Sequence, residues 1–150
     1  IWEGGHHVPF FVRWPGKVEA DTKCDRVITH TDLFATAAEV ASAKIPKGAA
    51  TDSYSYLSLL LGNEKKYSRP PVIHHSAGGM FAIREGDWKL ILGNGSGGRQ
   101  APKGKPFQKP YFLANIKTHS AETKNFVESK PRIAAQLEAA AKTIRENERR

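Results

Sequence analysis

Two runs of alternating side chains, joined by a three-residue link, constrain the fold of this chain more than any other feature. Phe81 and Ile83 alternate with smaller or polar neighbours within residues 80–84, and large apolar side chains recur at every second position of 88–92. A period of two is that of a β-strand, whose successive side chains point to opposite faces. The link, 85–87, is short and contains a glycine, as a hairpin connection requires. The pattern therefore predicts an antiparallel pair with at least one buried face.

The rest of the second half predicts a small sheet closed by a helix. Further strands are expected at 72–76 and 111–116. The segment 93–110 has five glycines, three prolines and four basic residues, a composition typical of a flexible surface loop. It lacks the Lys-Ser/Thr ending of a phosphate-binding loop. A helix is predicted from about Pro131, a residue favoured at the first helical position. Its apolar stripe consists of Ile133, Leu137, Ala140 and Ile144.

The first half predicts a strand followed by two helices. Residues 8–14 form an apolar run typical of a short buried strand, ended by a type II turn at 14–17. A helix is expected from Thr31 or Asp32, either of which can cap it, and a shorter one at 56–61. The polar, turn-rich segment after them, 63–71, is the expected boundary between subdomains. The predicted core-facing stripe of the first helix consists of Leu33, Ala37, Val40 and Ala41.

Composition narrows the class of protein. With 39% hydrophobic and 25% charged residues, the chain resembles an ordinary globular protein, and no apolar run approaches the ~20 residues of a membrane-spanning helix. The single cysteine, Cys24, excludes an internal disulfide framework and a multi-cysteine zinc site. We interpret it as a surface or half-buried residue and not as a nucleophile. Because Ile1-Trp2-Glu3 resembles mid-domain sequence, we expect the natural N-terminus to lie upstream.

The net charge of +8 is concentrated in the last third. Residues 1–92 hold 11 Lys and Arg against 10 Asp and Glu, whereas residues 93–150 hold 12 against 5. A basic segment of this kind suits an anionic polymer, nucleic acid or a lipid surface, and equally a solvated protein surface. Nucleic-acid binding would favour aromatic side chains between the basic ones. Only Phe107 and Tyr111 meet that need, so no nucleic-acid partner is expected.

Four segments in order carry a resemblance to formylglycine-dependent sulfatases of the arylsulfatase type. IWEGGHHVPFFVRWPGK resembles the family's E-G-G-H-R-V-P segment, and HTDLFATAAEVA is similar to the helix that follows it. RPPVIHHSAGGMFAIREGDWKLIL resembles the hairpin of the small domain. AETKNFVESKPRIAAQLEAAAKTI resembles the closing segment and terminal helix, so the resemblance covers nearly the whole chain.

The chain departs from the family pattern at three places. His7 stands where the family usually has arginine, and Ala114 where it usually has an aromatic residue. Thr118-His119-Ser120 replaces an acidic-proline turn. These departures concern substrate preference more than fold.

The resemblance implies an alkaline-phosphatase-like α/β fold. Residues 1–62 would form the C-terminal end of the large domain. Residues 63–150 would form a small C-terminal subdomain with the hairpin, the basic loop and the terminal helix. The resemblance implies further that the chain is the C-terminal part of a sulfuric ester hydrolase. The expected substrate is a sulfated carbohydrate or an aryl sulfate, and the family suggests a periplasmic or extracellular location.

The catalytic chemistry implied by the resemblance lies outside this chain. The longer parent protein is expected to use calcium and a formylglycine made from a C/S-x-P-x-R motif. Cys24 does not fit that motif, because Asp25, Arg26 and Val27 follow it. No carboxylate cluster suits calcium. We therefore expect no catalytic residue and no metal ligand here, no activity of the chain alone, and the missing N-terminal part as its partner.

Four histidines are the candidate substrate-binding residues. By resemblance, His6 and His7 follow a turn that leaves the cleft, and His74 and His75 end a strand of the small domain. Adjacent residues on a strand face opposite sides, so at most one of each pair is expected to face the cleft. A purely structural role for each pair stays open. The alternative function is a non-catalytic structural domain or one that binds an anionic polysaccharide through residues 93–110.

Overall fold

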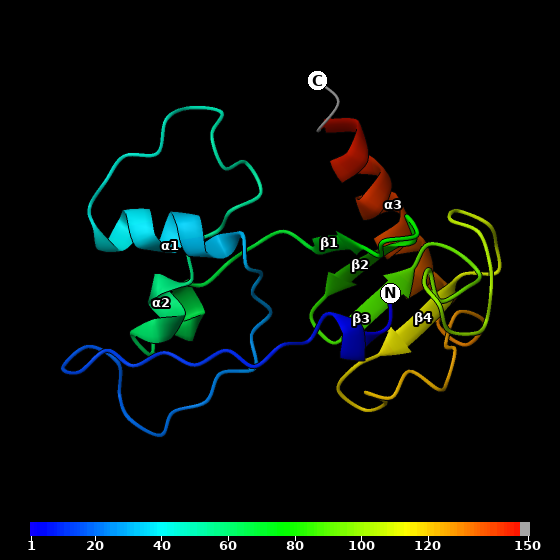
Figure 1. The fold of residues 1–150 in the computed structure, drawn as a ribbon, viewed down its shortest axis with the longest axis horizontal. Helices are drawn as coiled ribbons and strands as arrows, with labels where there is room; N and C mark the ends of the chain where they lie inside the picture. Colours follow the sequence, from blue (N-terminus) through cyan, green and yellow to red (C-terminus); the bar gives the residue numbers. More distant parts are fainter. Residues whose placement is uncertain (148–150) are drawn as a thin grey trace. The chain divides into compact units, whose positions relative to one another are not determined.

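The computed structural model describes residues 1–147 and divides the chain into two compact units (Figure 1). The sheet unit contains residues 1–9 together with the chain from Pro71 onward, and the helical unit contains residues 10–70. This division differs from the expected one at residue 62. The reason is that residues 1–3 supply side chains to the core of the sheet formed by the second half.

The sheet unit is built on four antiparallel strands in chain order: β1 (Val72–His75), β2 (Phe81–Glu85), β3 (Trp88–Ile91) and β4 (Phe112–Asn115). Glu85 pairs with Trp88, so Gly86 and Asp87 make the hairpin turn. Gly86 has φ +55°, a conformation that glycine adopts without strain. The structure confirms the predicted strands and hairpin to within one residue at each end.

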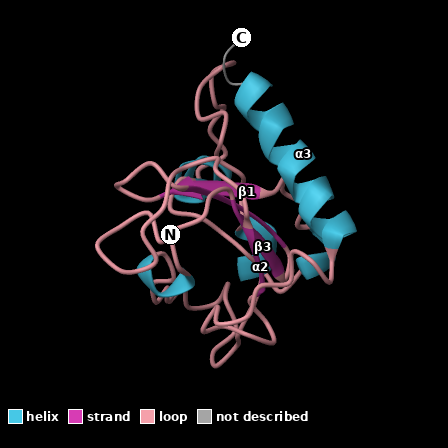
Figure 2. Cartoon of the chain, turned by 90° about the vertical axis from the view of Figure 1, so that its right-hand side faces the viewer, coloured by secondary structure: helices cyan, strands magenta, loops and turns pink. Residues whose placement is uncertain are grey.

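Helix α3 (Pro131–Asn147) packs on one face of this sheet, and Figure 2 shows it on one side with the N-terminus on the other. Leu137 is 1% exposed, and the other members of the predicted stripe pack against the same core, which confirms it. No helix among residues 1–147 combines the length and apolar character needed to cross a membrane. The buried core on this face consists of Ile83, Leu90, Leu92, Tyr111, Leu113, Ala134, Leu137 and Ala141.

The N-terminal segment covers the opposite face of the sheet. It contains a short 3-10 helix, η1 (Glu3–Gly5). Ile1 and Trp2 pack with Met80 and other side chains of the strands. Because both faces are covered, the alternation in β3 does not separate buried from exposed positions, and both Leu90 and Lys89 are 0% exposed.

The helical unit is organised around a buried carboxylate. It contains α1 (Asp32–Val40), α2 (Leu57–Leu60) and the 3-10 helix η2 (Glu64–Lys66), which confirms both predicted helices. The side chains of Thr31 and Asp32 do not cap α1, so that prediction was wrong. The fully buried Asp32 carboxylate accepts hydrogen bonds from the backbone of Thr29 at 2.7 Å and of Tyr54 at 3.0 Å, and it pairs with Arg69.

Two apolar patterns of the first half remain uncovered. Residues 8–14 are extended but pair with no strand among residues 1–147, and Phe11 is 90% exposed. The predicted buried strand is therefore absent, because a strand needs a neighbour to satisfy its backbone groups. The stripe of α1 is exposed as well, with Leu33 at 58%, while Ala35 and Thr36 are buried instead.

The segment 93–110, whose composition predicts a flexible surface loop, is packed against the sheet unit in its first residues, 93–97. Residues 98–110 are exposed, as expected, but Ser96 is 3% exposed. Gly93 bridges to Pro106, and a Cβ at Gly93 would lie 2.1 Å from the sulfur of Met80. The prediction of a surface loop was therefore wrong for residues 93–97, where the glycines allow close backbone packing.

Candidate functional site

Four charged side chains form a buried ion cluster, Glu3, Arg84, Lys89 and Glu122, on the face of the sheet covered by the N-terminal segment. Lys89 Nζ lies 3.3 Å from Glu3 Oε2 and 2.9 Å from Glu122 Oε1. Arg84 pairs with the other carboxylate oxygen of Glu3, and the Glu3 backbone N–H donates to Glu122 Oε2. The ion cluster therefore joins η1, β2, β3 and the segment after β4.

The charges of the ion cluster balance one another. Burial is the largest influence on Glu3 and raises the pKa of its carboxyl group, but Arg84 and Lys89 together outweigh it and hold that pKa below its ordinary value. Lys89 approaches Glu122 Oε1 at ion-pair distance, and that oxygen accepts no hydrogen bond from any group within residues 1–147. With two cations facing two carboxylates, the ion cluster offers no spare positive charge for a sulfate. We interpret it as a clamp that fixes the N-terminal segment on the sheet.

His6 and His74 lie against each other beside the ion cluster. Their ring centroids are 4.3 Å apart, with planes tilted by 58°. Burial, reinforced by the charge of Lys89, lowers the pKa of His74 to about 3. The His74 Nε2 atom is buried without a hydrogen-bond partner among the described residues. Because its pKa is about 3, His74 is neutral at physiological pH. Desolvation also lowers the pKa of His6, although much of that side chain is exposed.

The other two candidate histidines lie apart from this pair. His75 is exposed; its ring lies 5.5 Å from that of Phe81, and its Nδ1 lies 3.1 Å from the Ser76 carbonyl oxygen. Phe81 packs toward the α3 side, whereas Ala82, the register partner of His74, packs on the N-terminal side. The two histidines of β1 thus face opposite sides. His7 is exposed at the end of η1.

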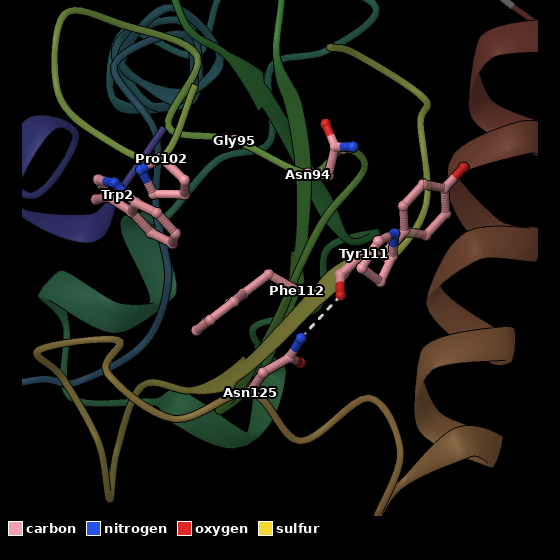
Figure 3. A pocket seen from close by; sticks show the side chains of 9 residues that line it. Trp2, Asn94, Gly95, Pro102, Tyr111, Phe112 and Asn125 are labelled. Atoms are coloured by element: carbon pink, nitrogen blue, oxygen red, sulfur yellow. Dashed lines mark hydrogen bonds between the residues drawn. The ribbon is translucent and has the colours of Figure 1, made fainter. Parts of the chain in front are cut away.

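An open pocket of about 150 Å³ lies beside β4 (Figure 3). Trp2 and Phe112 line it edge to face, with ring centroids 5.3 Å apart. Asn94 and Asn125 supply its polar lining, but the Asn125 amide already donates to the Tyr111 carbonyl at 2.9 Å. None of the four candidate histidines lines this pocket. We therefore do not assign it to the predicted site.

The described residues do not fit either expected cofactor. No group of three or more His, Cys, Asp or Glu side chains within residues 1–147 is placed to hold a metal ion. Calcium prefers six to eight oxygen ligands, and the buried carboxylates here are paired with Arg or Lys. Cys24 is exposed, and its following residues do not match the formylglycine motif.

Sequence reasoning missed the ion cluster. Neither the position of Glu3 before a Gly-Gly pair nor that of Lys89 in a hairpin strand suggests a charged partner. One available signal was that Lys89 shares a strand face with Ile91, so burial of Ile91 also buries the lysine. The position of Glu122 beyond β4 carries no periodic signal.

Known sulfatases are similar to this chain in sequence. No protein-family model matches the chain. A curated N-acetylgalactosamine-6-O-sulfatase of Bacteroides thetaiotaomicron is 36% identical over 90 residues, which are 60% of this chain and 17% of that protein. Human steryl-sulfatase is 31% identical over 83 residues, which are 55% of this chain and 14% of that protein.

A solved structure gives the same relationship over a longer span. It is described as BT33336S-sulf, from work on the metabolism of multiple glycosaminoglycans by Bacteroides thetaiotaomicron, and is 27% identical with a TM-score of 0.72. The match covers 91% of this chain and 28% of that one, so the chain spans well under half of each of these relatives. It confirms the predicted alkaline-phosphatase-like sulfatase fold with a small antiparallel sheet and a terminal helix. In sequence and in fold, the chain is related to the sulfatases, of which it spans a part.

Proposed function

We propose that this chain is the C-terminal part of a sulfatase that hydrolyses sulfate esters of a carbohydrate. The observation that supports the proposal most is the fold match to a sulfatase structure over almost the whole chain. The names of two relatives point to an aminosugar sulfate and to the metabolism of glycosaminoglycans. A steryl sulfate, suggested by the human relative, is the competing substrate class.

In this proposal the longer protein supplies the reacting groups. Calcium would provide the metal charge and a formylglycine the oxygen nucleophile. The calcium ligands and the residue that becomes formylglycine would both lie upstream of Ile1. Residues 1–9 and the chain from Pro71 onward then present side chains toward the substrate from the small subdomain. Residues 10–70 complete the large domain, which would cover Phe11 and Leu33.

Of the four candidate histidines, we propose that His75 contacts the substrate. It is exposed at the end of an edge strand and precedes a loop with two glycines, whereas His74 is largely buried and neutral. His6 packs on His74 and supports it. His7 is exposed as well but lies outside the strands described in residues 1–147, so His75, at a strand end, is the stronger candidate.

Two enzyme assays test the proposal. The 150-residue chain should not hydrolyse a chromogenic aryl sulfate in the presence of calcium, and the full-length parent should. In the parent, His75→Ala should lower kcat/KM for a 6-sulfated aminosugar oligosaccharide. The loss should correspond to about 1–3 kcal/mol of transition-state stabilisation, the range for one lost polar contact. Hydrolysis of the small aryl sulfate should change much less.

His30→Ala is the matched control, because His30 is an exposed histidine of the helical unit. It should leave both substrates unaffected. Calcium-dependent turnover by the 150-residue chain would show that the division of labour proposed above is wrong. An equal loss on both substrates in His75→Ala would show that His75 has a structural role.

A further inference from the structure

A row of aromatic and cationic side chains, partly open to solvent, runs from β1 to α3 in the sheet unit. The aromatic–cationic row consists of His75, Phe81, Phe107 and Arg145. Its successive rings are 5.5 Å apart, from His75 to Phe81 and from Phe81 to Phe107. The Arg145 guanidinium carbon lies 4.3 Å from the Phe107 centroid and 5.9 Å from that of Phe81. The row thus joins β1, β2, the loop 93–110 and α3.

Two rings of the row, those of His75 and Phe107, are open to solvent. Phe107 is 40% exposed and has φ +59°, a region that non-glycine residues rarely adopt. Its ring therefore sits at the surface at a conformational cost, stacked on Phe81. His75 is exposed too, and Arg145 is half-buried.

The charge around the row suits an anion. The Arg145 guanidinium lies over the Phe107 ring at a cation–π distance, and a guanidinium carries several N–H donors suited to an anion. Within residues 1–147 no carboxylate forms an ion pair with Arg145. The loop that carries Phe107, residues 93–110, has four basic residues and no acidic one; one of the four, Lys109, pairs with Glu138 of α3 at 3.4 Å.

We propose that the aromatic–cationic row is a binding surface for a sulfated oligosaccharide. The apolar faces of sugar rings would lie on Phe81 and Phe107. Arg145 would donate paired hydrogen bonds to a sulfate group, the geometry that its fork favours, and His75 would contact a hydroxyl at the other end. The choice of a sulfated sugar rests on the proposed function. The row itself rests on the observed contacts.

Binding to the 150-residue chain tests this proposal without any enzymatic activity. Isothermal titration with a 6-sulfated chondroitin hexasaccharide should show saturable binding, and the desulfated hexasaccharide should bind at least about tenfold more weakly, since a charged contact is lost. Arg145→Gln should weaken binding of the sulfated sugar about tenfold. Phe107→Asn should weaken both sugars, because it removes the ring while asparagine tolerates the left-handed backbone.

Arg132→Gln is the matched control, because Arg132 is an exposed arginine in the first turn of the same helix. It should bind like the wild type, and circular dichroism should show that all three variants keep the native fold. Arg145→Gln and Phe107→Asn should melt within a few degrees of the wild type.

If Arg145→Gln and Phe107→Asn are folded and bind the sulfated sugar normally, the row is not the binding surface. Equal binding of the desulfated sugar, or tighter binding of a single-stranded oligonucleotide of equal charge, would also overturn the proposal. Since no outcome depends on hydrolysis, it can fail while the sulfatase proposal stands.

Discussion

Replacing Lys89 by methionine should destabilise the sheet unit more than any other single change at a charged residue there. The side chain is 0% exposed and faces two carboxylates. Methionine has a similar length, so packing changes little, but Glu122, whose side chain is 3% exposed, loses its cation. Glu3 keeps Arg84. Breaking a buried pair from one side costs about 3–5 kcal/mol, a large share of the roughly 5–15 kcal/mol that stabilise a typical domain.

The pH dependence of the loss distinguishes a stranded charge from poor packing. In Lys89→Met the folded state holds a buried carboxylate without a cation, and acid relieves this cost by removing the negative charge. Stability of the variant relative to the wild type should therefore increase as pH falls. The wild type behaves oppositely at Glu3, whose pKa is held low. Its contribution is present above the unfolded pKa and is lost as pH falls through the folded one.

Urea unfolding at pH 8 and pH 5 measures both effects. In a Trp14→Phe background, fluorescence reports on Trp2 and Trp88, the tryptophans of the sheet unit. The deficit should shrink at pH 5, and Lys89→Met/Glu122→Gln should recover at least half of it, because no unpaired carboxylate remains.

Lys142→Met is the matched control: its side chain is 77% exposed and lies 3.9 Å from Glu146, so the change should cost less than about 0.5 kcal/mol. A deficit of Lys89→Met below about 1 kcal/mol at pH 8, or one that grows with acid, would refute the reasoning about the ion cluster.

Three further predictions concern other parts of the chain. Because the pKa of His74 is about 3 when folded and about 6.5 when unfolded, the unfolded state binds more protons between these values. Stability should fall by about 2 kcal/mol from pH 7 to pH 5 through this residue, and urea titrations of His74→Gln should lack that part of the slope. Asp32→Ala should destabilise the helical unit by about 3–5 kcal/mol in thermal and urea unfolding, since it leaves the Arg69 guanidinium without its carboxylate, whereas Asp52→Ala, at an exposed position, should be nearly neutral. Light scattering should show self-association of the 150-residue chain through exposed apolar side chains such as Phe11, and Phe11→Ser should reduce it; a clean monomer in the wild type would contradict this.

The sequence predicted the parts of the fold that depend on local periodicity. The alternation at 80–92 and the stripe of α3 gave strands, hairpin and helix with small errors, because each pattern has a partner within the chain. Residues 8–14 and the stripe of α1 have equally clear apolar patterns, yet they are exposed. A pattern shows which face is suited for burial, but burial itself requires a covering element.

The candidate site could be predicted less well, because its contacts join distant segments. Glu3 and Lys89 are 86 positions apart and Glu3 and Glu122 are 119 apart, so no spacing rule connects them. The adjacency of His74 and His75 did predict that they face opposite sides. It did not show which of them is buried, because that depends on where residues 1–6 lie.

The two faces of the sheet have different chemistry, and this difference guides the assignment of the histidines. On the N-terminal face, opposite charges neutralise each other within the ion cluster, and His74 is held neutral by burial. A group that can neither gain a proton near neutral pH nor reach solvent easily is poorly suited to bind a sulfate. On the α3 side, the row combines the exposed rings of His75 and Phe107 with a cation, Arg145, that forms no ion pair with a carboxylate among residues 1–147. An anionic sugar would therefore gain more from the row than from the ion cluster, although the ion cluster holds the larger number of charges.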